Sequence, residues 1–99
     1  MNDKQFNLSS IFEKQRDTLI IQGAFTLKQV EDTLSLYKQD KKSSNLHGHK
    51  IVCKKDKKRY SIAVQGTNQE YKILLSEQEI VHFIFIGHHK KYDRLTKRC

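Results

Sequence analysis

The chain has 99 residues, of which 36% are hydrophobic, and its mean hydropathy is −0.74. This length predicts a single domain, residues 1–99, with one modest core. No apolar run approaches the roughly 20 residues of a membrane span. The first residues, Met1 to Lys4, lack the basic-then-apolar pattern of a signal peptide. We therefore expect a cytoplasmic protein with no membrane association.

Basic side chains are concentrated in the second half of the chain. The formal net charge is +8. Residues 1–37 carry four basic and five acidic side chains, whereas residues 38–99 carry 15 basic and six acidic, a net charge of +9. A basic half-domain favours a polyanionic partner, with nucleic acid as the first candidate. An acidic protein, a membrane surface and simple solubility are the alternatives.

The two cysteines, Cys53 and Cys99, are too few for a disulfide framework or a zinc site. The favoured interpretation is a buried or half-buried, unbridged Cys53 and an incidental Cys99 at the end of the chain. A Cys53–Cys99 bridge and a nucleophilic Cys53 are the alternatives.

The first 23 residues predict a strand and a helix. Residues 4–8 form a short candidate strand. Ser10 and Glu13 have the spacing of a capping box, which predicts a helix from Ser10 to about Ile20, ended by Gly23. Four apolar side chains give this helix a face that can pack: Ile11, Phe12, Leu19 and Ile20.

A second capping box, Thr26 with Gln29, opens a second predicted helix. Apolar side chains at helical spacing form its buried stripe: Leu27, Val30, Leu34 and Tyr37. Lys41 and Lys42 suit the negative end of its dipole. The polar residues 39–48 predict a loop.

Beyond residue 48 the apolar pattern predicts strands rather than helices. Candidate strands are residues 49–53, 60–64, 71–75 and 80–86. A basic turn at 54–59, a hairpin turn at 65–68 and a polar turn at 76–79 separate them. The last run is apolar on both faces except for His82, which predicts a central strand that ends at Gly87. The tail from His88 is polar and basic.

These elements predict an α+β domain, with two N-terminal helices packed on a three- to five-stranded, mainly antiparallel sheet. In this order they resemble the RelE/ParE superfamily of bacterial toxins. Residues 30–51 are similar to the family's second helix, its loop and the start of its sheet, through Leu46, His49, Lys50 and Ile51. Residues 71–92 are similar to the family's last hairpin, through Ile86, Gly87, His88 and Tyr92.

The resemblance implies a toxin that is held by a cognate antitoxin. The family's usual activity is endoribonucleolytic cleavage of mRNA, in many members on the ribosome, and a divergent branch poisons DNA gyrase. The resemblance implies neither a cofactor nor a metal, and the spacing of His47 and His49 alone is too little for a metal site. The antitoxin segment that fills the basic groove is expected to be acidic.

Metal-free RNA cleavage needs a base for the 2′-hydroxyl, a cation for the phosphate and an acid for the leaving 5′-oxygen. Histidine suits the first and third roles and lysine the second. The expected catalytic residues are His88, His89, Lys72 and Tyr92. Lys72 stands where the family commonly has an arginine, and Tyr92 would orient or stack on a base. The expected RNA-binding residues are His49, Lys50, Lys57, Lys58, Arg59, Lys90, Lys91 and Arg94.

The sequence departs from the family where some members carry strand lysines. The corresponding residues are Ser61, Ala63 and Gln65. Either the basic run 57–59 substitutes for those lysines, or the chain cleaves poorly or not at all. An mRNA-cleaving toxin is the favoured function, ahead of a non-catalytic gyrase poison or inactivated toxin and an unrelated nucleic-acid-binding domain. Strand register, which the sequence does not fix, decides whether His88 or His89 faces the site.

Overall fold

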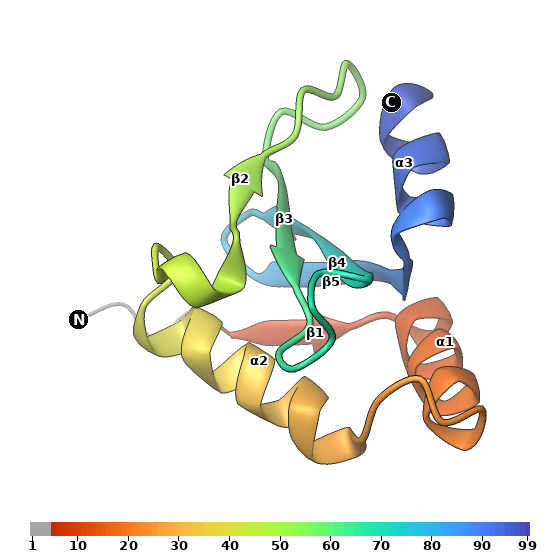
Figure 1. Cartoon of the computed structure of the whole chain (residues 1–99). Helices are drawn as coiled ribbons and strands as arrows, with labels where there is room; N and C mark the ends of the chain where they lie inside the picture. The colour runs from red at the N-terminus through yellow and green to blue at the C-terminus, as the bar shows by residue number, and fades with distance from the viewer. Residues whose placement is uncertain (1–4) are drawn as a thin grey trace.

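Figure 1 shows a computed structural model of the chain, which describes residues 5–99. In chain order the elements are β1 (Phe6–Leu8), α1 (Ser10–Ile21), α2 (Leu27–Gln39), a 3₁₀ turn (Ser44–Leu46), β2 (His49–Lys50), β3 (Arg59–Ala63), β4 (Tyr71–Glu77), β5 (Val81–His88) and α3 (His89–Lys97). Met1 to Lys4, and with them the start of the strand predicted at 4–8, lie outside the described residues.

The five strands form one sheet in the order β1-β5-β4-β3-β2. β1 pairs with β5 in parallel, and the other neighbours are antiparallel. α1 and α2 pack on one face, and α3 lies on the other side of the sheet (Figure 1). The predicted α+β architecture is confirmed, but α3 was not predicted. None of the helices within residues 5–99 combines the length and apolar character that a bilayer crossing requires.

The start of α2 is as predicted. The Gln29 backbone N–H donates to Thr26 Oγ1 at 3.2 Å, and the Thr26 N–H donates to Gln29 Oε1 at 2.8 Å. Gln29 also donates through Nε2 to the Gln65 carbonyl at 3.0 Å, which fixes α2 against the turn after β3. The capping box therefore sets both the first turn of α2 and its place on the sheet.

The predicted capping box of α1 was wrong by one residue. Ser9 is the N-cap, because its hydroxyl accepts the Phe12 backbone N–H at 3.1 Å, and Ser10 is the first helical residue. Phe12 is fully buried against the sheet, whereas Ile11, which the sequence placed on the same packing face, is 63% exposed.

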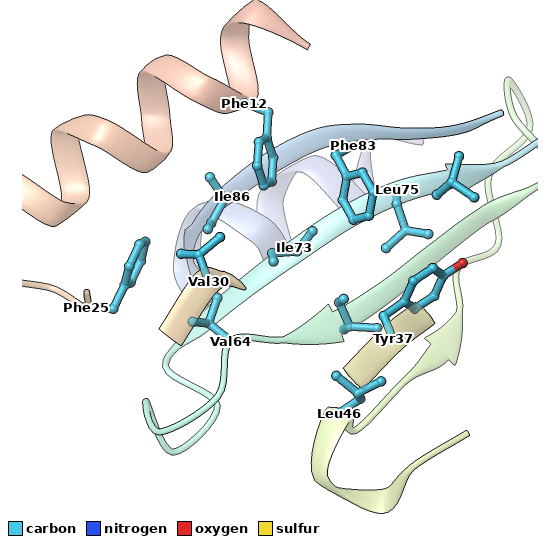
Figure 2. Packing of buried hydrophobic residues seen from close by; sticks show 12 residues of the cluster. Phe12, Phe25, Val30, Tyr37, Leu46, Val64, Ile73, Leu75, Phe83 and Ile86 are labelled. Atoms are coloured by element: carbon cyan, nitrogen blue, oxygen red, sulfur yellow. The ribbon is translucent and has the colours of Figure 1, made fainter. Parts of the chain in front are cut away.

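The main core lies between the two N-terminal helices and the sheet. Figure 2 shows Phe12 and Phe83 meeting beneath α1, with Val30 and Tyr37 reaching up from α2. Tyr60, Ile62 and Val64 point into this core or pack at its edge, as their alternation predicted. Leu27 is 48% exposed, so the buried stripe of α2 is narrower than predicted.

Several strand boundaries differ from the prediction, and β3 is shifted by one residue, to Arg59–Ala63. β2 includes only His49 and Lys50 of the run 49–53, and β4 continues through Glu77 into the predicted turn. β5 was predicted to end at Gly87, but it continues through Gly87 to His88. A Cβ on Gly87 would lie 2.5 Å from Cζ of Phe85, so glycine is needed inside this strand to accommodate a neighbouring ring.

A β-bulge in β5 sends two of its phenylalanines to opposite faces of the sheet. Leu75 pairs with Phe83 and Leu74 with Phe85, so Ile84 is an extra residue on β5. The bulge changes which residues of β5 face α1 and α2 and which face α3. Phe83 belongs to the main core, whereas Phe85 points to the opposite side of the sheet.

The opposite face holds a smaller core, formed by Ile51, Leu74, Phe85 and Tyr92. Because α3 runs back over the sheet, it brings Cys99 to the β2–β3 loop, where a disulfide joins it to Cys53 with Cα atoms 4.6 Å apart. The Lys54 backbone N–H also donates to the Cys99 carbonyl at 3.3 Å. The favoured interpretation of two unbridged cysteines was wrong, because it lacked the helix that brings them together.

Candidate functional site

The α3 side of the sheet joins His49 of β2 to Tyr92 of α3. The Tyr92 hydroxyl lies 3.1 Å from His49 Nε2, and His49 Nδ1 lies 3.3 Å from the His47 carbonyl oxygen. A carbonyl only accepts, so the neutral ring carries its proton on Nδ1 and accepts the Tyr92 O–H at Nε2. The His49 side chain is exposed, whereas Tyr92 is buried. The pair therefore has one end in solvent and one end fixed in the core.

The environment of Tyr92 keeps its hydroxyl neutral. Burial raises the pKa of Tyr92, and the carboxylate of Asp93 raises it further, while the neighbouring Ser61 hydroxyl offsets part of this rise. The Ser61 hydroxyl is itself buried and has no well-formed hydrogen bond within residues 5–99. Ser61 was noted only as a missing lysine, yet it lies beneath the His49–Tyr92 pair: β2 and β3 pair His49 with Ser61.

Lys72 of β4 is the cation on this face. It pairs with Ala63 on one side and Gly87 on the other, and its Nζ lies 3.5 Å from Gln69 Oε1. Burial lowers the pKa of Lys72, and the Asp93 carboxylate opposes this shift. An ammonium that is partly removed from water interacts more strongly with an incoming anion.

His88 and His89 have different roles in the structure. His88 pairs with Tyr71 across the sheet, its ring meets the Tyr71 ring edge-on at 5.4 Å, and its Nδ1 accepts the Lys90 backbone N–H at 3.3 Å as the N-cap of α3. His89 opens α3, with Nδ1 3.9 Å from Asp93 Oδ2. Residues three and four apart share a helix face, so His89 lies on the same side of α3 as Tyr92 and Asp93.

The expected RNA-binding cations fall into two groups. Lys90, Lys91 and Arg94 are exposed on α3, away from the buried Tyr92. The other four lie around an open pocket of about 330 Å³ at the β2–β3 edge, lined by Lys41, Lys50, Lys57, Lys58, Arg59, Tyr60 and Glu77. Lys41 belongs to this group although it was not selected from the sequence. Successive strand residues point to opposite faces, so Lys50 turns away from His49.

No three His, Cys, Asp or Glu side chains within residues 5–99 are grouped closely enough to hold a metal ion. The groups gathered on the α3 side are an exposed imidazole, a neutral phenol, a half-buried ammonium and a second imidazole beside a carboxylate. Together they can exchange protons and bind an anion. Asp93 was missed because its spacing from His89 has meaning only on a helix that the sequence did not predict.

The fold is shared with bacterial toxins of known structure. YafQ from Escherichia coli, in its DinJ–YafQ toxin–antitoxin complex, superposes with a TM-score of 0.71 over 91% of this chain and 97% of that chain, at 11% identity. A copper-bound mutant toxin from Helicobacter pylori gives a TM-score of 0.69 over 89% and 97%, at 18% identity. A conserved hypothetical protein from Helicobacter pylori gives 0.56 over 88% and 96%, at 19% identity.

These superpositions establish a RelE-like fold, as the sequence predicted. No family model matches the sequence, and no curated protein matches it significantly. At these identities the likeness is one of fold, so function has to be argued from the site.

Proposed function

We propose that the chain is the toxin of a toxin–antitoxin module and cleaves mRNA without a metal ion. The observation that carries this proposal is the contact between the exposed imidazole of His49 and the buried hydroxyl of Tyr92, on the sheet face that also holds Lys72. The fold shared with YafQ supports a toxin role. We propose the cytoplasm as its location.

His49 is the proposed general base. When RNA binds, its 2′-hydroxyl displaces the His47 carbonyl from Nδ1, and the ring takes the other tautomer, with Nε2–H donating to the Tyr92 oxygen. This exchange is possible because a tyrosine hydroxyl both donates and accepts. Nδ1 then removes the 2′-hydroxyl proton. Tyr92 touches only His49 in this scheme, so it is a positioning residue.

Lys72 and His89 complete the proposed reaction. The 2′-oxygen forms a bond to phosphorus while the bond from phosphorus to the 5′-oxygen breaks. Lys72 stabilises the charge that grows on the phosphate oxygens. A protonated His89, held by Asp93, gives its proton to the leaving 5′-oxygen. His88 stays outside the chemistry, because it caps α3 and packs on Tyr71.

The proposed antitoxin contributes an acidic segment that folds onto the basic surface. The exposed cations of α3, Lys90, Lys91 and Arg94, give that segment or RNA an electrostatic contact without base selectivity. The neighbour in its DinJ–YafQ complex supports a protein partner of this kind.

A second candidate function rests on one observation. Ser61 and Ala63, which stand where some family members have lysines, are buried in β3 and carry no charge. If Lys72 and His89 do not compensate for the missing cations, the chain is a non-catalytic member that acts by binding, for example to DNA gyrase.

The deciding experiment expresses the chain from a tightly repressed promoter in a bacterium and maps new 5′ ends of mRNA within minutes of induction. New ends that disappear in a His49→Ala variant support cleavage at this site, and in-frame ends support action on the ribosome. A His47→Ala variant is the matched control, since within residues 5–99 Tyr92 bonds to the His49 side chain and not to that of His47. Growth arrest without new ends would favour the non-catalytic function.

A further inference from the structure

The pocket at the β2–β3 edge lies on the face of the sheet opposite to the His49–Tyr92 pair. The Tyr60 ring lines the pocket, and its centre lies 6.4 Å from the centre of the Tyr37 ring of α2. Lys50 pairs with Tyr60, just as His49 pairs with Ser61 on the other face. The pocket is therefore separate from the proposed catalytic groups but adjacent to them in sequence.

Two of the pocket's five cations already have partners. Lys41 Nζ lies 2.7 Å from Glu77 Oε1 and 4.7 Å from the centre of the Tyr60 ring. The second oxygen of Glu77 accepts the Tyr37 hydroxyl, so both carboxylate oxygens are occupied. Arg59 Nε lies 3.1 Å from Asp56 Oδ2 in a largely buried pair.

Three cations remain without a counter-charge. Lys50, Lys57 and Lys58 are exposed, and none of them forms an ion pair within residues 5–99. Three ammonium groups around one open pocket repel each other unless an anion joins them. The pocket therefore suits a ligand with several negative charges at short intervals.

The three side chains can bind phosphate. Lysine ammonium groups bind phosphate as point charges, without the bidentate geometry that the planar fork of arginine offers to carboxylates and phosphates alike. The fork in this pocket, Arg59, is already bound to Asp56. Lysines alone give affinity for a sugar–phosphate backbone and no choice of base.

β2 supplies a route from one face to the other. It is the last strand of the sheet and only two residues long, so its outer side has no neighbouring strand within residues 5–99. A single strand of RNA that leaves His49 can cross this edge and meet Lys50 directly. We propose that the pocket of Lys50, Lys57 and Lys58 binds the phosphate backbone of the single-stranded RNA that is cleaved at His49, a proposal that rests on the function proposed above.

The test measures binding and cleavage separately. Binding is followed by fluorescence anisotropy of a short, labelled single-stranded RNA with 2′-O-methyl sugars, which cannot be cleaved, over a range of salt concentrations. The pocket variant combines Lys50→Gln, Lys57→Gln and Lys58→Gln. The control variant combines Lys14→Gln, Lys28→Gln and Lys38→Gln on α1 and α2, so both variants lose the same charge.

We expect the pocket variant to bind about tenfold or more weakly at low salt, and its slope of log affinity against log salt to fall by about 2, since each phosphate contact with a single strand contributes about 0.7. The control variant should keep the wild-type slope. An equal loss of RNA affinity in both variants would contradict a phosphate site in the pocket, and would leave the proposed RNA cleavage unaffected. A specific loss in the pocket variant with no cleavage by the wild type would support the pocket and contradict the proposed function.

Two further outcomes would overturn the RNA proposal. One is a wild-type protein that does not bind the RNA probe. The other is an oligoglutamate peptide whose affinity depends on the three lysines while that of RNA does not, which would assign the pocket to an acidic protein segment. Thermal unfolding of each variant checks that the fold is kept, as expected for exposed side chains of which only Lys28 has an ion-pair partner, the exposed Asp32.

Discussion

The Tyr92 hydroxyl and His49 Nε2 are 3.1 Å apart, although 43 residues separate them along the chain. The contact connects β2 to α3, where Tyr92 is 5% exposed and packs with Ile51, Leu74 and Phe85. A histidine on a two-residue edge strand is free to rotate unless something holds its ring. The His47 carbonyl holds it at Nδ1 and Tyr92 holds it at Nε2, and the contact with Tyr92 links the packing of α3 to the chemistry proposed for β2.

The first prediction separates base from positioning residue. His49→Ala should reduce RNA cleavage by 10²-fold or more, since general-base catalysis contributes about 10²–10⁴. Tyr92→Phe should reduce cleavage by about fivefold, because it loses one hydrogen bond of about 1 kcal/mol but keeps the ring packing. Initial rates against pH for both variants provide the measurement.

Tyr71→Phe is the matched control, because Tyr71 is a half-buried tyrosine that packs on Phe25 on the opposite face. It should leave the cleavage rate and its pH profile unchanged. If Tyr92→Phe lowered the rate without changing the pH profile, and Tyr71→Phe did the same, the loss would reflect stability alone and the positioning role would be wrong.

The second prediction concerns Lys72, whose charge is disfavoured by burial. Lys72→Met keeps the aliphatic stem and removes the ammonium, so thermal stability should be unchanged or higher. Cleavage should fall by about 10²-fold, the usual effect of losing a charge-stabilising group. Lys14→Met, a change on the exposed side of α1, should alter neither quantity. A destabilised Lys72→Met protein would contradict this account.

The third prediction concerns the ionisation of Tyr92. Its pKa is raised, first by burial and then by Asp93, so its phenolate should form only above the ordinary tyrosine value of about 10. The fold favours the protonated form, so this stabilisation is complete below about pH 10 and is lost as the pH rises through the folded-state pKa. The phenolate absorbance of the wild type minus that of Tyr92→Phe isolates this residue from the other tyrosines. An ordinary midpoint in the folded protein would mean that Tyr92 is solvated.

Sequence reasoning worked where the signal was local. Thr26 and Gln29 satisfy each other's backbone groups within one turn, so the start of α2 could be predicted from four residues. The same pattern misplaced the cap of α1, because Ser9 and Ser10 are adjacent and only the burial of Phe12 distinguishes them. The choice between two neighbouring caps depends on the sheet, which the local pattern does not contain.

The candidate site was harder to predict because it depends on α3. Within this helix only Tyr92 is buried, and the remaining residues are mostly charged, so no apolar stripe indicates a helix. Without α3 there was no reason to bring His49 and Tyr92 together, to pair His89 with Asp93, or to bridge Cys53 and Cys99. The residue types of the site could be predicted from the sequence, whereas their grouping could not.

The last prediction concerns the disulfide that fixes the end of α3. Cys53 and Cys99 are 46 residues apart, and closing a loop of that size in the unfolded chain stabilises the fold by about 4 kcal/mol in the chain-entropy model. Replacing both cysteines with serine should lower the free energy of unfolding by up to about that amount. It should also speed hydrogen exchange at the backbone amides of α3.

Cytoplasmic thiols keep most disulfides reduced. For the cytoplasmic location proposed above, the comparison of oxidised and reduced protein therefore also concerns cleavage activity. A dithiol reductant converts the bridge to two thiols while its own thiols form a disulfide, and α3 is then held mainly by the burial of Tyr92. We expect the reduced wild type and the double serine variant to have the same unfolding midpoint, below that of the oxidised protein. They should also share one cleavage activity, lower than that of the oxidised protein but not abolished, because the end of α3 is no longer fixed while Tyr92 still holds the helix on the sheet. Equal midpoints with and without reductant would show that the bridge does not hold α3 in solution.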